Sequence, residues 1–163
     1  MIRYAVTDDL ASITGIYNQA INVGFQTAFT EEFCTEDRVD WFNTHSAEAH
    51  PIFVFEKEAR IVGWLSVSAY RRGRGALRYA VELSYFIDKD FQRQGIGAHL
   101  LSHAVEACRE LGYKTLLAII LEPNAASAAL LEKFGFEKWA YLPRIADFDG
   151  VECSQVYYGL KLA

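Results

Sequence analysis

The stretch Phe91-Gln92-Arg93-Gln94-Gly95-Ile96-Gly97-Ala98 decides how this chain is interpreted, because it joins an apolar strand to an amphipathic helix. The strand is predicted at about residues 79–88, and the helix runs to Leu111 before Gly112 ends it. Two glycines at such a junction let the backbone approach an anion closely. The N–H groups of the first helical turn then point at the bound charge. The stretch therefore predicts a cradle for a pyrophosphate.

Two other phosphate-binding patterns do not fit this stretch. A P-loop would end in Gly-Lys-Ser/Thr, and a Rossmann fingerprint would need a third glycine and an acidic residue closing the next strand. Neither pattern is present. A plain structural interpretation stays open, in which Gly95 and Gly97 only form a tight turn or allow close helix–sheet packing.

A second block follows the next predicted strand. It begins Leu121-Glu122-Pro123-Asn124-Ala125-Ala126-Ser127 and ends Leu130-Leu131-Glu132-Lys133-Phe134-Gly135-Phe136. Asn124 is a preferred N-cap residue, and Gly135 suits the left-handed position that ends a helix. The block therefore predicts a short capped helix between two strands.

These blocks resemble the GCN5-related N-acetyltransferases (GNAT). Gln92-x-x-Gly95-x-Gly97 resembles the family signature Gln/Arg-x-x-Gly-x-Gly/Ala, and the strand, glycine loop, helix, strand and Asn-capped helix occur in the family's order and spacing. The resemblance covers nearly the whole chain and looks closest to the phosphinothricin acetyltransferase-like branch. That branch is also suggested by Ile16-Tyr17-Asn18, Glu36-Asp37-Arg38 followed by Trp41-Phe42, Glu82, and Pro143 ahead of Asp149-Gly150.

The resemblance implies an α/β fold with a mixed, mostly antiparallel sheet that is flanked by helices and splayed around an acetyl-CoA site. It also implies direct transfer of an acetyl group to the amine of a small amino acid or an analogue such as phosphinothricin, methionine sulfoximine or methionine sulfone. A homodimer is the assembly it suggests. Two alternatives stay open: a non-catalytic acyl-CoA-binding regulatory module, and an acetyltransferase for peptide or protein N-termini.

Composition fits one globular domain over residues 1–163, because 52% of the residues are hydrophobic and 23% are charged. The net charge of −5 gives no basic surface for nucleic acid. The sequence shows no signal-peptide run at its start and no bilayer-spanning stretch, so we expect a cytoplasmic protein without membrane contact. The three cysteines lack Cys-x-x-Cys spacing and are expected to be reduced.

Hydrophobic periodicity predicts the remaining elements. The segments 24–34 and 71–78 are expected to be irregular and to frame the substrate. Helices are expected from Thr7 or Asp8 to about Val23 and from about Thr35, and strands at about 2–5, 52–57, 60–70, 115–121, 136–142 and 152–161, with 52–57 and 60–70 antiparallel.

Glu82 is the candidate general base. A free α-amino group has a pKa of about 8, so a proton must leave before the amine can attack. Strand alternation places Glu82 with Ser84 and Phe86 on one face, and neither face reads as ordinary wet surface. The alternative is a solvated or salt-bridged glutamate near the start of a strand, with Arg78 as a candidate partner. The match to the glutamate of the phosphinothricin acetyltransferase-like enzymes favours the base, acting through water.

The resemblance implies the cofactor contacts. The backbone of the central strand would hold the pantetheine arm, residues 93–98 the pyrophosphate, and the capped helix the remaining arm. Lys133 could equally be a solvated lysine, and Leu131 stands where many members have a proton-donating tyrosine, so no general acid is assigned. The predicted acetyl-CoA contacts are Tyr85, Phe86, Ile87, Arg93, Gln94, Gly95, Ile96, Gly97, Ala98, Asn124 and Lys133.

The arginine-rich run at 71–78 is expected to contribute to substrate binding. Guanidinium groups bind carboxylate or phosphinate in a bidentate way and could turn the substrate amine towards Glu82. Arg74 has the best-matching position, Arg72 and Arg78 are alternates, and Phe29 could close over the substrate. A solvated loop is the expectation for at least half of these arginines.

His99 and His103 lie one helical turn apart, but a third ligand is not evident. We expect no metal.

Overall fold

The structure is a computed structural model that describes residues 1–163, and one seven-stranded sheet of order β1-β2-β3-β4-β5-β7-β6 runs through it. Every neighbouring pair is antiparallel except β4 and β5, which are parallel. The predicted mixed, mostly antiparallel sheet and the antiparallel hairpin β2–β3 are confirmed. The strands are β1 (Ile2–Tyr4), β2 (Ile52–Lys57), β3 (Arg60–Ala69), β4 (Ala80–Ile87), β5 (Thr115–Leu121), β6 (Glu137–Phe148) and β7 (Val151–Lys161).

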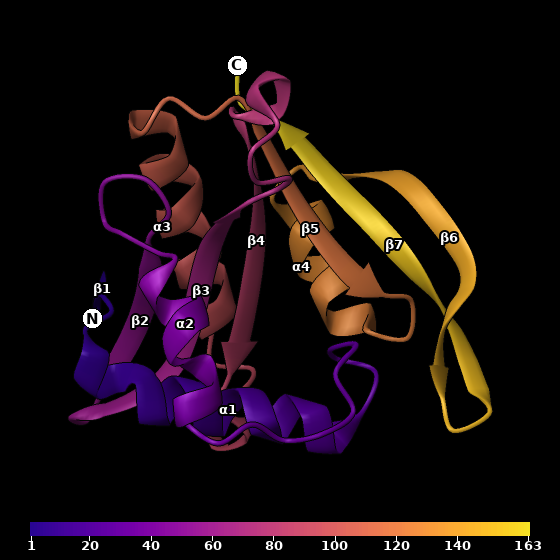
Figure 1. Cartoon of the computed structure of the whole chain (residues 1–163), viewed down its shortest axis with the longest axis horizontal. Coiled ribbons are helices and arrows are strands. Elements are labelled where there is room, and N and C mark those ends of the chain that lie inside the picture. Colours follow the sequence, from indigo (N-terminus) through magenta and orange to yellow (C-terminus); the bar gives the residue numbers. More distant parts are fainter.

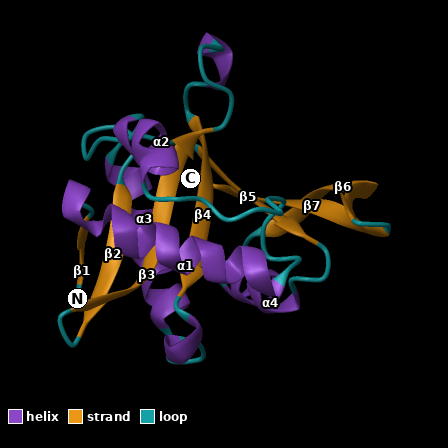
Figure 2. Ribbon diagram, turned by 60° about the horizontal axis from the view of Figure 1, so that its bottom comes forward, coloured by secondary structure: helices purple, strands orange, loops and turns teal.

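Helices cover both faces of the sheet. Helices α1 and α2 pack on one face, around Ile13 and Trp64, and α3 and α4 pack on the other, around Leu100 and Leu131. Figure 2 shows α1 lying across the strands of the first half of the sheet. The α-helices are α1 (Leu10–Val23), α2 (Val39–Asn43), α3 (Ile96–Glu110) and α4 (Ala125–Lys133), and 3-10 turns lie at η1 (Thr7–Asp9), η2 (Glu36–Arg38), η3 (Gly75–Leu77) and η4 (Lys89–Phe91).

The predicted amphipathic helix after the glycine loop is α3. Its apolar residues recur every three or four positions and are buried against the sheet, as the pattern of a surface helix requires. Gly112 follows with a φ of 83°, the left-handed conformation expected of a glycine that ends a helix. The hydrophobic core between α3 and the sheet also includes Leu131 of α4, which is fully buried.

Strands β4 and β5 part soon after they begin. Only Ala80, Val81 and Glu82 of β4 pair with β5, although β4 continues to Ile87 and β5 to Leu121. Figure 1 shows the two strands together at one end and far apart at the other, with α4 beside the gap. The predicted splay of the sheet is thus confirmed, and beyond Glu82 one side of β4 has no strand partner.

Strand β6 is longer than the predicted strand at 136–142. Proline has no N–H for the ladder, so Pro143 interrupts regular pairing. The register shifts between Leu142 and Ala146, Arg144 takes a φ of 48°, and pairing with β7 resumes to Phe148. The bulge accommodates Pro143 at a position where no ladder hydrogen bond is needed. The β6–β7 hairpin projects from the rest of the molecule (Figure 2).

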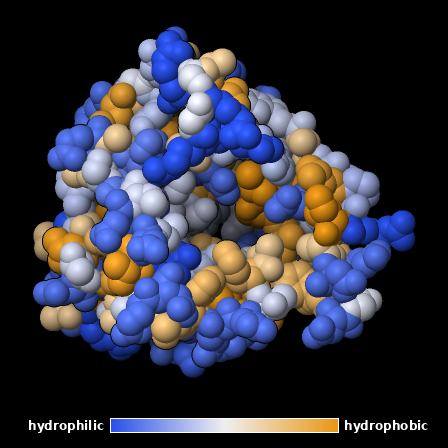
Figure 3. Space-filling model, viewed as in Figure 1, coloured by the Kyte–Doolittle hydropathy of each residue, from blue (hydrophilic) through white to orange (hydrophobic).

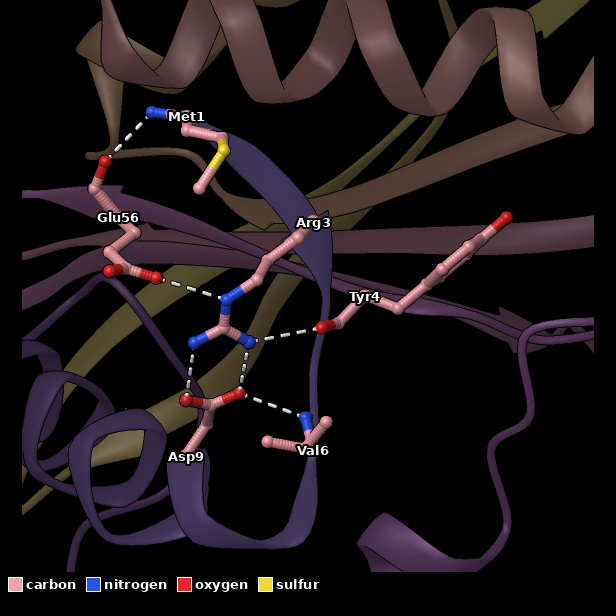
Figure 4. A network of polar contacts seen from close by, with 6 residues as sticks. All are labelled: Met1, Arg3, Tyr4, Val6, Asp9 and Glu56. Carbon is pink, nitrogen blue, oxygen red and sulfur yellow. Dashed lines mark hydrogen bonds and ion pairs between the residues drawn. The ribbon is translucent and has the colours of Figure 1, made fainter.

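Polar contacts fasten the N-terminal strand to its neighbours (Figure 4). Arg3 donates from Nη1 and Nη2 to the Asp9 carboxylate at 2.7 and 2.9 Å, and from Nε to Glu56 at 3.0 Å. The Val6 N–H donates to Asp9 at 2.8 Å, and the Met1 ammonium to the Glu56 carbonyl oxygen at 2.7 Å. We call Arg3, Asp9 and Glu56 the N-terminal ion cluster.

None of the helices combines the length and the apolar character needed to cross a bilayer.

The three cysteines are free: Cys108 and Cys153 are buried and Cys34 is exposed. Burial raises the pKa of the Cys108 thiol to about 12, so it behaves as a small apolar residue.

Candidate active site

The parting of β4 and β5 opens into two adjoining cavities that share Gln26 and Phe86 as wall residues. The first, of about 510 Å³, lies between the end of β4, the start of α3 and α4. The second, of about 320 Å³, lies over Glu82 on the face covered by α1 and α2. Figure 3 shows a hollow near the middle of this face, bordered by both polar and apolar residues. We call the first of these cavities the cradle cavity and the second the acceptor cavity.

The backbone of the glycine loop forms the rim of the cradle cavity. Arg93 and Gly95 both have left-handed backbones, with φ values of 60° and 78°, and Gly95 caps the N-terminus of α3. A turn of this kind gathers successive N–H groups into a concave anion site, and the helix dipole adds to it. For Arg93 the left-handed conformation is strained, and such strain is concentrated at functional sites.

The cradle cavity brings together ten of the eleven predicted acetyl-CoA contacts. Asn124 and Lys133 are among them, although the former also caps α4 by accepting the Ser127 N–H at 3.3 Å. Gln94 is the exception, because its side-chain oxygen accepts a hydrogen bond from Lys57 at 2.7 Å and does not line the cavity. The ten are Tyr85, Phe86, Ile87, Arg93, Gly95, Ile96, Gly97, Ala98, Asn124 and Lys133.

Two further details of this cavity fit a bound molecule. A Cβ on Gly97 would lie 3.3 Å from Leu130 Cδ2, so the glycine allows α3 and α4 to approach each other. The Tyr85 hydroxyl is covered and has no hydrogen-bond partner. Burial raises the pKa of the Tyr85 hydroxyl, and the nearby Ser127 side chain opposes this only in part. The two hydroxyl groups do not form a hydrogen bond of good geometry.

Glu82 is half-buried in the acceptor cavity and forms no ion pair within 4 Å. Burial raises the pKa of its carboxyl group. The alternative pairing with Arg78 is wrong, because Arg78 donates to the Gly75 carbonyl at 2.8 Å and lies over the Tyr79 ring at 4.4 Å.

Arg38 is the residue of this cavity that sequence reasoning missed. Its side chain is 7% exposed, makes no ion pair, and packs over Trp41 at 3.9 Å, Tyr17 at 4.8 Å and Phe33 at 5.1 Å. The Nε atom is covered and has no acceptor. A usable signal was the Arg38-x-x-Trp41 spacing, which places the two side chains on neighbouring turns, and the aromatic residue at position 33 just before them.

The arginine-rich loop does not line the acceptor cavity. Arg72, Arg74 and Arg78 are exposed, and each donates to a backbone carbonyl, of Thr44, Arg72 and Gly75 respectively. The expectation that these arginines face Glu82 is therefore not met in this chain, because Arg74 and Arg78 donate to carbonyls within the loop itself. Arg72 donates to the end of α2 instead.

Phe29 does line the acceptor cavity and meets the Tyr17 ring edge-on at 5.9 Å between centroids. Segment 24–34 thus frames the cavity as expected, whereas segment 71–78 does not.

His99 and His103 lie on the exposed side of α3, against Phe55 and Phe53 respectively. The structure contains no group of three or more histidine, cysteine, aspartate or glutamate side chains that could hold a metal ion.

Known proteins share this architecture. A profile of the Acetyltransferase (GNAT) family matches residues 18–136. YwnH of Bacillus subtilis (strain 168), provisionally named a phosphinothricin acetyltransferase, is 37% identical over 99% of both chains. The L-methionine sulfoximine/L-methionine sulfone acetyltransferase of Salmonella typhimurium is 31% identical over 88% of this chain and 84% of that protein. A GNAT superfamily phosphinothricin acetyltransferase from Sinorhizobium meliloti, solved in complex with AcCoA, matches with a TM-score of 0.93 at 28% identity, covering 99% of this chain and 88% of that one.

Proposed function

The chain belongs to the GNAT family and is an acetyl-CoA-dependent N-acetyltransferase, and from this premise we propose that its acceptor is the amine of a small amino acid or an amino-acid analogue. The names of its relatives support this acceptor class, since they specify phosphinothricin and methionine sulfoximine or sulfone. One observation carries the proposal most directly: a half-buried, unpaired carboxylate lies in a cavity that adjoins a pyrophosphate cradle.

The cradle cavity suits acetyl-CoA, which supplies an acetyl group activated as a thioester. The loop of Arg93, Gly95 and Gly97 offers backbone N–H groups to a pyrophosphate. The side of β4 without a strand partner offers N–H and C=O groups to an extended amide-containing arm, as a neighbouring strand would. The unpartnered Tyr85 hydroxyl and Asn124 add polar groups along the same wall.

Glu82 is proposed to take the proton from the acceptor ammonium, directly or through a water. Its raised pKa brings it closer to that of the ammonium, which eases proton transfer. The carboxylate must be ionised to accept the proton, so activity falls as the pH drops through the raised pKa of Glu82.

Leu131 and the cysteines bear on the remaining steps. Leu131 is fully buried and has no proton to donate, so coenzyme A is proposed to leave as a thiolate, which a thiol pKa of about 8.5 permits. None of the cysteines lines either cavity. Direct transfer in a ternary complex therefore suits the site better than an acyl-cysteine intermediate.

A substrate screen tests the proposal. Free thiol released from acetyl-CoA is measured with the common amino acids, methionine sulfone, methionine sulfoximine, phosphinothricin and short peptides. Turnover with one or more free amino acids or analogues is expected. Turnover with peptides alone would instead establish an N-terminal acetyltransferase, and the absence of turnover with any amine would contradict the proposal. The homodimer and the cytoplasmic location stay predictions, and light scattering of the purified protein checks the first.

A further inference from the structure

Arg38 is a buried cation without an anionic partner. With 7% of its surface exposed, it has lost most of its water, yet it has no carboxylate within 4 Å and no hydrogen-bond acceptor. Burying an unpaired charge is costly. The faces of Tyr17, Phe33 and Trp41 offset part of this cost through cation–π contacts. Aromatic rings do not supply lone pairs to the five N–H donors of a guanidinium, so its hydrogen-bonding capacity stays unused.

The free capacity of Arg38 is directed at the acceptor cavity. Arg38 is one of its wall residues, and of its three nitrogens only Nε is fully covered. Trp41 and Tyr17 line the same cavity, so the rings that hold the guanidinium also shape the space in front of it. A planar guanidinium fixed in this way is preorganised for bidentate binding of an oxyacid group.

The same cavity contains a second unpaired charge of opposite sign. Glu82 and Arg38 both line it, and they lie too far apart to form an ion pair. Tyr17 lines the cavity together with both residues, and the Arg38 guanidinium lies 4.8 Å from the centroid of its ring. A ligand that completes both walls must carry a cationic end for Glu82 and an anionic end for Arg38, which is the charge pattern of a zwitterion.

We propose that Arg38 binds the anionic oxyacid group of the acceptor and so restricts the enzyme to zwitterionic amines. This inference rests on the proposed transfer reaction and adds to it the group that fixes acceptor specificity. The anionic oxygen comes either from the α-carboxylate or from an acidic side chain such as a phosphinate. In both cases the acceptor lies across the cavity, with its amine at Glu82.

The test compares matched acceptors in wild type and in Arg38→Gln. L-Methionine sulfone and its amide differ in the α-carboxylate charge, whereas phosphinothricin and methionine sulfone differ in the side-chain charge. Charge-assisted bidentate bonds are strong, so we expect Arg38→Gln to lower one of these two preferences in kcat/KM about 10- to 100-fold, chiefly through KM. A loss of the acid-over-amide preference assigns the α-carboxylate, and a loss of the phosphinothricin preference assigns the side chain.

Controls separate specificity from damage. Calorimetry of acetyl-CoA binding shows whether Arg38→Gln keeps its fold, and Arg109→Gln, on the exposed face of α3, serves as the matched arginine substitution. Arg38→Lys keeps the charge and is expected to retain part of the preference. If both preferences survive in Arg38→Gln, or if Arg74→Gln abolishes them instead, the inference is overturned.

A binding measurement on the wild type keeps the test independent of any variant. Trp41 contacts the guanidinium, so its fluorescence is expected to change when methionine sulfone or phosphinothricin is added in the presence of coenzyme A, and to change far less with an amide that carries no anionic group. Equal responses to charged and uncharged acceptors would count against Arg38. A wild type that acetylates none of the acceptors would refute the proposed function, whereas turnover with unchanged preferences in the variant would refute only the role of Arg38.

Discussion

The N-terminal ion cluster and the acceptor cavity use the same kinds of side chain in opposite ways. In the cluster, Arg3 gives two hydrogen bonds to Asp9 and one to Glu56, and a backbone N–H also donates to Asp9. In the acceptor cavity, Arg38 is more deeply buried than Arg3 and Glu82 is half-buried, yet neither has an ionic partner. Under our proposal, hydrogen-bond saturation, rather than burial or charge, separates the structural polar groups of the cluster from the ligand-binding groups of the cavity.

The pKa values follow the same division. Burial raises the pKa of Asp9, but the hydrogen bonds from Arg3 and the Val6 N–H outweigh it, so the net pKa is lowered. For Glu82, burial acts alone and the pKa is raised. For Arg38, burial lowers the pKa. The cluster stabilises its charged forms, whereas the acceptor cavity leaves its charges in need of a partner.

The largest expected difference between the two regions is in catalysis. Glu82→Gln removes the proposed base while keeping the size of the side chain, so we expect kcat to fall about 10²- to 10⁴-fold. Calorimetry should show unchanged acetyl-CoA affinity, because Glu82 does not line the cradle cavity. Asp9→Asn, in the ion cluster, is the counterpart and should leave kcat within about twofold. Undiminished turnover in Glu82→Gln would remove this residue from the mechanism.

The next difference is in stability. Asp9→Asn removes the negative charge and one of the two oxygens that accept from Arg3, and it leaves that cation partly unpaired. We expect about 2 kcal/mol lower unfolding free energy, since Arg3 is one-third exposed. Urea denaturation measures it. Asp8→Asn, on the exposed neighbouring carboxylate, is the control and should change stability by less than about 0.5 kcal/mol. Equal effects of the two substitutions would mean that the cluster is not a structural fastening.

The two carboxylates should also respond oppositely to pH. Asp9 has a lowered pKa, so its contribution to stability is present above its unfolded pKa of about 3.9 and disappears as the pH falls through its folded value. Glu82 has a raised pKa, so its ionisation costs stability, and that cost develops as the pH rises from about 4.3 through its folded value.

Melting temperatures of the two variants across pH measure this contrast. The destabilisation by Asp9→Asn should shrink as the pH falls below about 4, because Asp9 protonates first in the unfolded state and, at lower pH, in the folded state as well. The melting temperature of Glu82→Gln should exceed that of wild type more at about pH 8 than at about pH 4. Parallel curves for the two variants would show that the carboxylates occupy similar environments, contrary to the structure.

The smallest expected difference concerns two hydroxyl groups. Tyr113 donates to the Ala49 carbonyl at 2.6 Å, whereas the covered Tyr85 hydroxyl has no partner. Tyr113→Phe should lower the unfolding free energy by about 1 kcal/mol, and Tyr85→Phe should leave it unchanged or slightly higher. Denaturant titrations of the ligand-free protein compare them directly. A larger loss for Tyr85→Phe would reveal a structural hydrogen bond at that hydroxyl.

The cradle cavity was predictable because most of its parts are consecutive in sequence. Residues 93–98 and the end of β4 lie within one strand–loop–helix unit, and Asn124 begins the next helix. Local rules for glycine, N-caps and hydrophobic periodicity act over such distances. The predicted strand at 136–142 was too short, because a bulge with a left-handed Arg144 carries β6 past Pro143 to Phe148.

The acceptor cavity was only partly predictable because its walls come from distant segments. Arg38 lies in an acidic, polar turn that is typical of surface, and its burial depends on aromatic residues at positions 17, 33 and 41. The arginines at 71–78 were candidates because they precede Glu82 in sequence. Proximity along the chain did not bring their side chains to the cavity, since Arg72, Arg74 and Arg78 donate to backbone carbonyls outside it.

The early parting of β4 and β5 has a consequence for solubility as well as for binding. A row of unpaired backbone groups at a sheet edge normally invites strands from other molecules, and proteins must shield such edges. Here the edge lies inside the sheet, and residues of α4 and segment 24–34 line the cavities that lead to it. The unpaired edge of β4, which we propose pairs with the acetyl-CoA arm, is thus shielded from strands of other molecules.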